Sequence, residues 1–149
     1  MKVLIDTCVV MDFLQHREPF ADDAKAIFRA AACEQFTGYI TAKSATDIYY
    51  LIHRCTHSDK ESRNKLNSLL SIISMIDTAS IDIFHALSSE TTDFEDAVMI
   101  ETASRLHADC IVTRNQKDYK KSSVPVFNPS EFLQQQKNKK QNSHSFHLP

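Results

Sequence analysis

Short apolar runs alternate with longer amphipathic segments along most of the chain. Apolar runs of about four residues predict buried strands at residues 2–5, 37–40, 110–113 and 124–127. Apolar positions spaced three and four apart predict helices, which cover residues 9–14, 19–31, 42–54, 59–73, 80–87, 92–106 and 130–136. Strands separated by helices of this length pair in parallel through right-handed crossovers. The pattern therefore predicts a three-layer α/β/α sandwich with a central, mainly parallel sheet.

Polar residues at the predicted helix starts support these boundaries. Thr41 stands at the N-cap of the third helix, and Ser58 with Glu61 forms a capping-box pattern at the start of the fourth. Asp93 can cap the helix at residues 92–106, where the helix dipole favours negative charge.

The chain length of 149 residues suits one domain, which we assign to residues 1–136. Residues 137–149 are polar and lack a helical apolar period, so they predict a mobile C-terminal tail. No secretory signal is visible and no apolar run approaches the ~20 residues that span a bilayer. We therefore expect a cytoplasmic protein without a membrane partner.

Composition excludes several classes of function. The chain has one glycine, Gly38, whereas dinucleotide-binding fingerprints and Walker A loops need several. The four cysteines match no zinc-ligand spacing. A formal net charge of −2 provides no global attraction for nucleic acid. Any nucleic-acid binding must therefore be local, or use a metal ion to neutralise phosphate.

Several carboxylates stand where the predicted elements do not require them. Asp6 directly follows the first strand, and Asn115 follows the strand at residues 110–113. Open α/β sheets bind ligands beyond the carboxyl ends of their strands, so both side chains belong at that edge. Asp47 and Asp96 lie inside predicted helices, where aspartate is unfavourable because its side chain competes for backbone groups.

Each of these carboxylates alone is most simply a solvated helix-face residue, but the set suggests a metal site. Asp6, Asp47 and Asp96 come from separate elements that this fold can bring to one sheet edge. Either Asn115 or Asp118 completes the set. Hard oxygen ligands suit Mg²⁺ or Mn²⁺ rather than Zn²⁺. One or two such ions can activate water and stabilise the charge of a phosphodiester transition state.

The sequence resembles the PIN-domain ribonucleases of the VapC toxin type. The resemblance rests on LIDTCVVMDFL, SATDIYYLI, DFEDAVMIETASRLHADCIVTRN and QKDY, and it extends from about residue 2 to 132. It implies a PIN-like nuclease domain over residues 1–136, an RNA substrate, a small antitoxin partner and a homodimer.

In that family, four acidic positions hold the metal ion. Carried over, the first falls on Asp6, the second on Asp47 (commonly glutamate) and the third on Asp96. The fourth lies just past the TR of VTRN, where many members carry aspartate and this chain has Asn115, with Asp118 three residues further on. Either Asn115 or Asp118 can therefore be the fourth site residue. We assign Asp118 to the acidic cluster and expect Asn115 to contact metal-bound water or substrate.

Basic and polar residues follow the last predicted site strand. Thr113 matches a polar family position near the site, and Arg114 and Lys117 are placed to contact RNA phosphate beside the metal. A solvated loop face explains these two cations equally well.

The resulting hypothesis is an Mg²⁺- or Mn²⁺-dependent endoribonuclease. Such an enzyme could serve as the toxin of a toxin–antitoxin pair. The alternative is a catalytically weak PIN module that binds nucleic acid or a protein partner. A dehalogenase-type phosphatase needs aspartate two positions after Asp6, where Cys8 stands. A phospho-receiver domain needs an acidic pair at the first strand, which is absent from the sequence.

Overall fold

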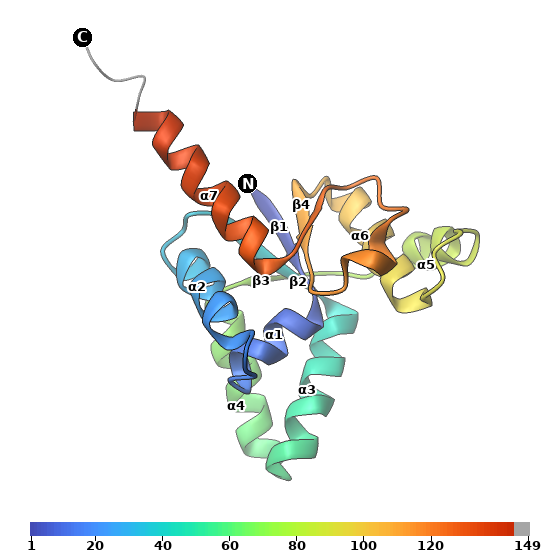
Figure 1. Ribbon diagram of the computed structural model, residues 1–149. Coiled ribbons are helices and arrows are strands. Elements are labelled where there is room, and N and C mark those ends of the chain that lie inside the picture. The colour runs from blue at the N-terminus through green and yellow to red at the C-terminus, as the bar shows by residue number, and fades with distance from the viewer. Residues whose placement is uncertain (145–149) are drawn as a thin grey trace.

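A five-stranded parallel sheet forms the centre of the molecule in this computed structural model, which describes residues 1–144 (Figure 1). The strand order is β3-β2-β1-β4-β5, and every neighbouring pair is parallel. The strands are β1 (Lys2–Ile5), β2 (Thr37–Thr41), β3 (Ser74–Ile76), β4 (Cys110–Val112) and β5 (Val126–Phe127). This architecture confirms the predicted three-layer α/β/α sandwich.

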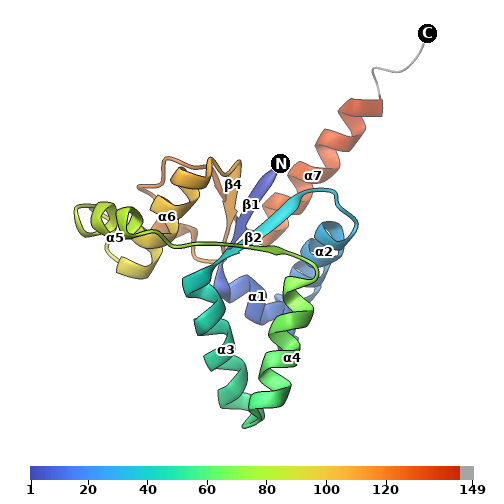
Figure 2. The same cartoon turned by 180° about the vertical axis from the view of Figure 1, so that it is seen from behind.

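Helices cover both faces of the sheet (Figures 1 and 2). They are α1 (Thr7–Leu14), α2 (Ala21–Ala32), α3 (Ala42–Thr56), α4 (Asp59–Leu70), α5 (Ser80–Leu87), α6 (Phe94–Leu106), the 3₁₀ helix η1 (Gln116–Tyr119) and α7 (Pro129–His144). Alternate residues of β1 point to opposite faces, as the strand repeat requires. Val3 and Ile5 join the core that α1, α2 and α7 complete, whereas Leu4 packs with residues of α6.

Predicted side-chain caps form at three helix starts, but the capping box of Ser58 and Glu61 forms only in part, because the Ser58 amide donates to the Thr56 hydroxyl and the Glu61 carboxylate pairs with Lys65. The Thr41 side chain accepts a hydrogen bond from the Ser44 amide, and the Ser58 side chain accepts one from the Glu61 amide. Asp93 accepts from the amides of Glu95 and Asp96, and it thereby fixes the first turn of α6. These bonds satisfy amides that have no partner within the helix.

Two parts of the sequence prediction need correction. The helix predicted to reach residue 73 ends at Leu70, and after a turn the edge strand β3 begins at Ser74, which the sequence did not suggest. The last helix was predicted to stop at residue 136 but continues to His144. The predicted mobile tail therefore begins as helix, and residues 145–149 lie outside the described part of the chain.

Helix α5 is joined to α6 by a buried carboxylate. Asp82 is 1% exposed and accepts hydrogen bonds from the Arg105 Nε at 2.8 Å and the Thr102 hydroxyl at 3.1 Å. It also accepts a hydrogen bond from the Ala79 amide at 2.8 Å. Burial would raise the pKa of Asp82, but the Arg105 guanidinium and these hydrogen bonds outweigh it and lower the pKa.

Over residues 1–144, no helix combines the length and the apolar character needed to cross a membrane.

Candidate active site

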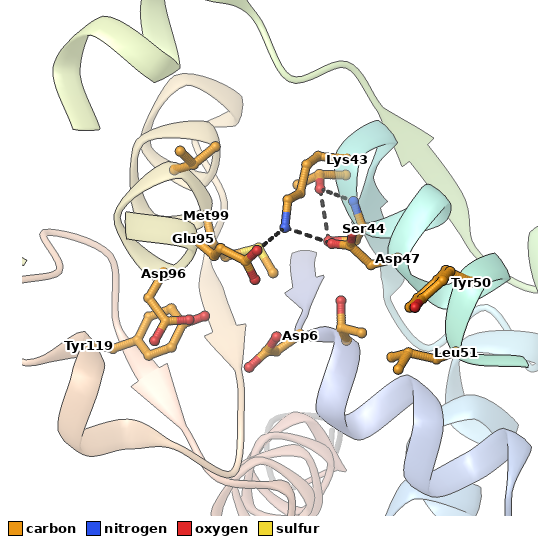
Figure 3. A pocket seen from close by; sticks show the side chains of 13 residues that line it. Asp6, Lys43, Ser44, Asp47, Tyr50, Leu51, Glu95, Asp96, Met99 and Tyr119 are labelled. Atoms are coloured by element: carbon orange, nitrogen blue, oxygen red, sulfur yellow. Dashed lines mark hydrogen bonds and ion pairs between the residues drawn. The ribbon is translucent and has the colours of Figure 1, made fainter. Parts of the chain in front are cut away.

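One cavity of about 290 Å³ opens at the carboxyl edge of the sheet, where β1 and β2 end. Asp6, Asp47 and Asp96 all line it, so the fold brings together three of the predicted site residues (Figure 3). They come from the end of β1, from α3 and from the first turn of α6, respectively. The cavity forms there because the helices that follow parallel strands all begin at this edge of the sheet.

Asp6 is held in place by its neighbours on β4 and α1. Its amide donates a hydrogen bond to the Val112 carbonyl at 3.0 Å, which ties the end of β1 to β4. The hydroxyl of Thr113, which is fully buried, donates to Asp6 Oδ2 at 2.7 Å, and the Cys8 thiol donates to the same oxygen at 3.3 Å. Thr113 thus lies beside the site, as predicted, and supports a carboxylate.

Asp96 has the most perturbed carboxyl group of the cavity. Burial, and then the negative charges of Asp6, Asp93 and Asp118, raise its pKa from 3.8 to about 6, partly offset by the nearby Tyr119 hydroxyl. Tyr119 faces Asp96 in Figure 3, and its buried hydroxyl has no partner that completes a hydrogen bond among the described residues. Like charges that lie this close favour binding of a proton or a cation.

Asp47 is paired with a lysine that the sequence analysis did not single out. Lys43 Nζ lies 2.7 Å from Asp47 Oδ2 on the same helix and 2.9 Å from Glu95 Oε1 on α6 (Figure 3). Burial lowers the pKa of Lys43, but hydrogen bonds to the two carboxylates outweigh it and raise the pKa above its ordinary value. The i, i+4 spacing of Lys43 and Asp47 was the available sequence signal. Nothing local indicated Glu95.

Asn115 and Asp118 lie next to each other at the start of η1. The Asn115 amide group donates a hydrogen bond to the Asp118 carboxylate, and the Asn115 backbone amide donates to the Thr113 hydroxyl at 3.0 Å. Neither residue lines the cavity, but the Asp118 charge contributes to the raised pKa of Asp96. Asp118 therefore influences the site through its charge, without lining the cavity.

The two predicted phosphate-binding cations are not brought to the cavity. Arg114 Nε lies 2.6 Å from Oδ2 of the buried Asp12, and its guanidinium stacks over the Phe20 ring at 4.1 Å. Burial of Asp12 raises its pKa, and the Arg114 charge counteracts this effect. Lys117 is exposed on η1 and does not line the cavity.

The donors around the cavity fit a hard divalent cation in their chemistry. Cavity-lining aspartates supply only oxygen, the ligand that Mg²⁺ and Mn²⁺ prefer. Within the described residues, no three side chains of Asp, Glu, His or Cys converge closely enough to ligate one ion. Mg²⁺ commonly keeps several waters and is bound by only one or two protein carboxylates, so the chemistry of this lining is compatible with such an ion.

An acidic cavity at the carboxyl edge of a parallel α/β/α sheet is suited to the chemistry of nucleases that act on phosphodiesters. The family model described as "PIN domain" matches residues 2–117. The chain therefore belongs to the PIN-domain family, which is a family of nucleases. No protein sequence with a curated description matches the chain significantly.

Solved structures of toxin–antitoxin proteins share this fold. VapBC2 from Rickettsia felis bound to a promoter DNA fragment is 18% identical, with a TM-score of 0.67 over 86% of this chain and 98% of that chain. A toxin–antitoxin complex from Klebsiella pneumoniae is 20% identical, with a TM-score of 0.63 over 85% and 97% of the two chains. VapC20 from Mycobacterium tuberculosis, a sarcin–ricin loop cleaving toxin, is 12% identical, with a TM-score of 0.58 over 73% and 86%.

Proposed function

We propose that the protein is a divalent-metal-dependent endoribonuclease and the toxin of a toxin–antitoxin pair. The observation that carries this proposal is the meeting of Asp6, Asp47 and Asp96 in one cavity, where burial and then the charges of neighbouring carboxylates raise the pKa of Asp96. Separate elements supply the three carboxylates, and the repulsion between Asp96 and the neighbouring charges of Asp6, Asp93 and Asp118 is unfavourable unless a cation compensates for it. Membership of the PIN-domain family supports the same chemistry.

Asp6 and Asp96 would hold the cation, with Asp47 and Asp118 adding negative charge around it. When bound, Mg²⁺ or Mn²⁺ activates a water and stabilises charge on the phosphodiester. Thr113 orients Asp6 through the hydrogen bond of 2.7 Å, and Asp93 fixes the turn that carries Asp96. The expected products carry a 5′-phosphate and a 3′-hydroxyl.

We assign RNA contact to the residues that follow β4. Asn115 is hydrogen-bonded to Asp118 of η1, and Lys117 is exposed on this short helix. Arg114 would reach a phosphate only after leaving Asp12, to which it is paired at 2.6 Å.

The partners follow from the solved structures that share the fold. Several of these are complexes of a toxin with its antitoxin. We therefore propose a small antitoxin protein as partner, a homodimer as the toxin's own assembly, and the cytoplasm as its location. An adjacent reading frame that encodes a small protein with a DNA-binding head would support the antitoxin, and light scattering of the purified chain tests the dimer.

A labelled single-stranded RNA tests the activity. We expect cleavage with Mg²⁺ or Mn²⁺ and none with EDTA, and the Asp96→Asn variant purified in parallel should be inactive. Cleavage that persists in EDTA, or equally in the variant, contradicts the proposal because it indicates another mechanism or a contaminating nuclease.

The pairing of Asp47 with Lys43 favours a second candidate, a catalytically weak PIN module that retains RNA or a protein partner. A carboxylate that is neutralised by an ammonium group contributes less to a metal site. Metal-independent retention of RNA without cleavage, measured on the same labelled substrate, would identify this alternative.

A further inference from the structure

Lys43 is a cation among the acidic residues that line the cavity. Its ammonium lies 2.7 Å from Asp47 on α3 and 2.9 Å from Glu95 on α6. The two helices stand on opposite sides of the cavity, and the lysine side chain extends between them (Figure 3). The ammonium therefore occupies the position of a counter-ion for Asp47.

The stability of the fold does not account for this bridge. The side chains of Lys43 and Asp47 are each 38% exposed and that of Glu95 is 74% exposed, and ion pairs this exposed contribute little to folding. A cavity that gathers carboxylates needs positive charge even before a metal ion binds. The Lys43 ammonium supplies that charge from within the chain.

We propose that Lys43 is a positioning residue that competes with the divalent cation for Asp47, so that the cation binds fully only when the ammonium releases this carboxylate. This inference rests on the proposed function, because it requires that the cavity bind a divalent cation. When the ammonium leaves Asp47, Glu95 keeps it at the cavity edge. Within residues 1–144, the ion pairs of Lys43 are to Asp47 and Glu95, so Asp6 and Asp96 remain available as primary ligands.

Mn²⁺ binding to the RNA-free protein tests the competition directly. The paramagnetic resonance signal of free Mn²⁺ reports binding without any need for catalysis. We expect Lys43→Met to bind Mn²⁺ about three- to tenfold more tightly than the unmodified chain, the range expected when one partly exposed cation is removed from beside a ligand.

A double-mutant cycle separates competition for Asp47 from a general effect of charge. In the Asp47→Asn background, Lys43→Met should change Mn²⁺ affinity by less than about twofold, because the carboxylate for which the two cations compete is gone. A Lys43→Met effect of equal size in both backgrounds overturns the proposal, since it shows that the lysine acts only through its charge.

The chain offers a matched control on α4. Lys65 pairs with Glu61 at 3.1 Å with the same i, i+4 spacing and a similar side-chain exposure of 42%, and neither residue lines the cavity. Lys65→Met should leave Mn²⁺ affinity unchanged. Circular dichroism checks that each variant folds, and Lys43→Gln replaces Lys43→Met if the latter does not.

Two further outcomes also overturn the proposal. Unchanged Mn²⁺ affinity in Lys43→Met together with a raised KM for RNA identifies Lys43 as a contact for substrate phosphate instead. Absence of Mn²⁺ binding in the unmodified chain removes both this inference and the proposed metal-dependent activity. If the unmodified chain binds Mn²⁺ and cleaves RNA, but Lys43→Met has the same effect on Mn²⁺ affinity in both backgrounds, only the inference about Lys43 is refuted and the proposed function stands.

Discussion

Replacing Asp96 with asparagine should stabilise the folded protein while it abolishes RNA cleavage. Asparagine keeps nearly the same volume but cannot ionise, so the cost of burying a charge disappears together with the repulsion from Asp6, Asp93 and Asp118. The backbone amide of residue 96 still donates to the Asp93 cap. The first turn of α6 should therefore remain intact, and the variant separates site electrostatics from helix capping.

The pKa of Asp96 sets the size of the effect. It rises from 3.8 to about 6, and each unit of difference between folded and unfolded chains corresponds to about 1.4 kcal/mol. The full difference corresponds to about 3 kcal/mol, which solvent screening of this half-buried carboxylate reduces to about 1–2 kcal/mol. A change of that size should raise the melting temperature by about 3–6 °C for a chain of this length.

The pH dependence has a defined direction. A carboxyl group with a raised pKa in the folded state binds its proton more tightly there than in the unfolded chain, so ionised Asp96 destabilises the fold above about pH 6. This penalty fades as the pH falls from about 6 to 4, because the folded carboxyl becomes protonated. The advantage of Asp96→Asn should thus be greatest at pH 7.5 and small at pH 4.

Urea unfolding in EDTA, followed by circular dichroism at pH 7.5, 5.5 and 4.5, measures this difference. Asp22→Asn removes an exposed carboxylate at the start of α2 and should change the free energy of unfolding by less than about 0.5 kcal/mol. Mn²⁺ should stabilise the unmodified chain more than Asp96→Asn. An Asp96→Asn variant that is no more stable at pH 7.5, or whose advantage is independent of pH, refutes the electrostatic reasoning.

Three other predictions test particular contacts. Asp118→Asn should raise the Mg²⁺ concentration for half-maximal activity by weakening the negative charge near the site, whereas a rise seen only with Asn115→Ala would make Asn115 the site residue. Asp82→Ala should lower the free energy of unfolding by about 2–3 kcal/mol in urea titrations, since it breaks a buried charged network, and a loss below ~1 kcal/mol would contradict this role. Gly38→Ala should lower the free energy of unfolding by about 1–2 kcal/mol in the same assay, because the added Cβ would lie 2.9 Å from a methyl group of Ile73. A variant of equal or greater stability would contradict this and show that the core adapts.

The sequence alone determined the elements whose signals are local. Helix periodicity and the N-caps at Thr41 and Asp93 were predicted and are confirmed, because each depends on residues within one turn. Of the capping box at Ser58, only the bond from the Glu61 amide to the serine side chain is confirmed. The parallel pairing of the strands followed from the alternation of strands and helices. The position of Asp6 at the carboxyl edge followed from that topology, whereas Asp96 was assigned to the site through the family resemblance.

Tertiary structure decided the features that depend on partners distant in the sequence. The edge strand β3 exists because Ser74–Ile76 pairs with β2, and its three residues carry too little pattern to be recognised alone. Likewise, the packing of α7 against α2 was invisible in a polar sequence, and it accompanies a helix longer than the one predicted.

The same reason explains what was missed at the site. Arg114 turns away from the cavity because the buried carboxylate of Asp12 requires an opposite charge, and only the folded chain brings the two together. Lys43 and Glu95 meet because α3 and α6 face each other across the cavity. Sequence spacing indicates which residues share an element, whereas the direction of a long charged side chain depends on the charges that surround it after folding.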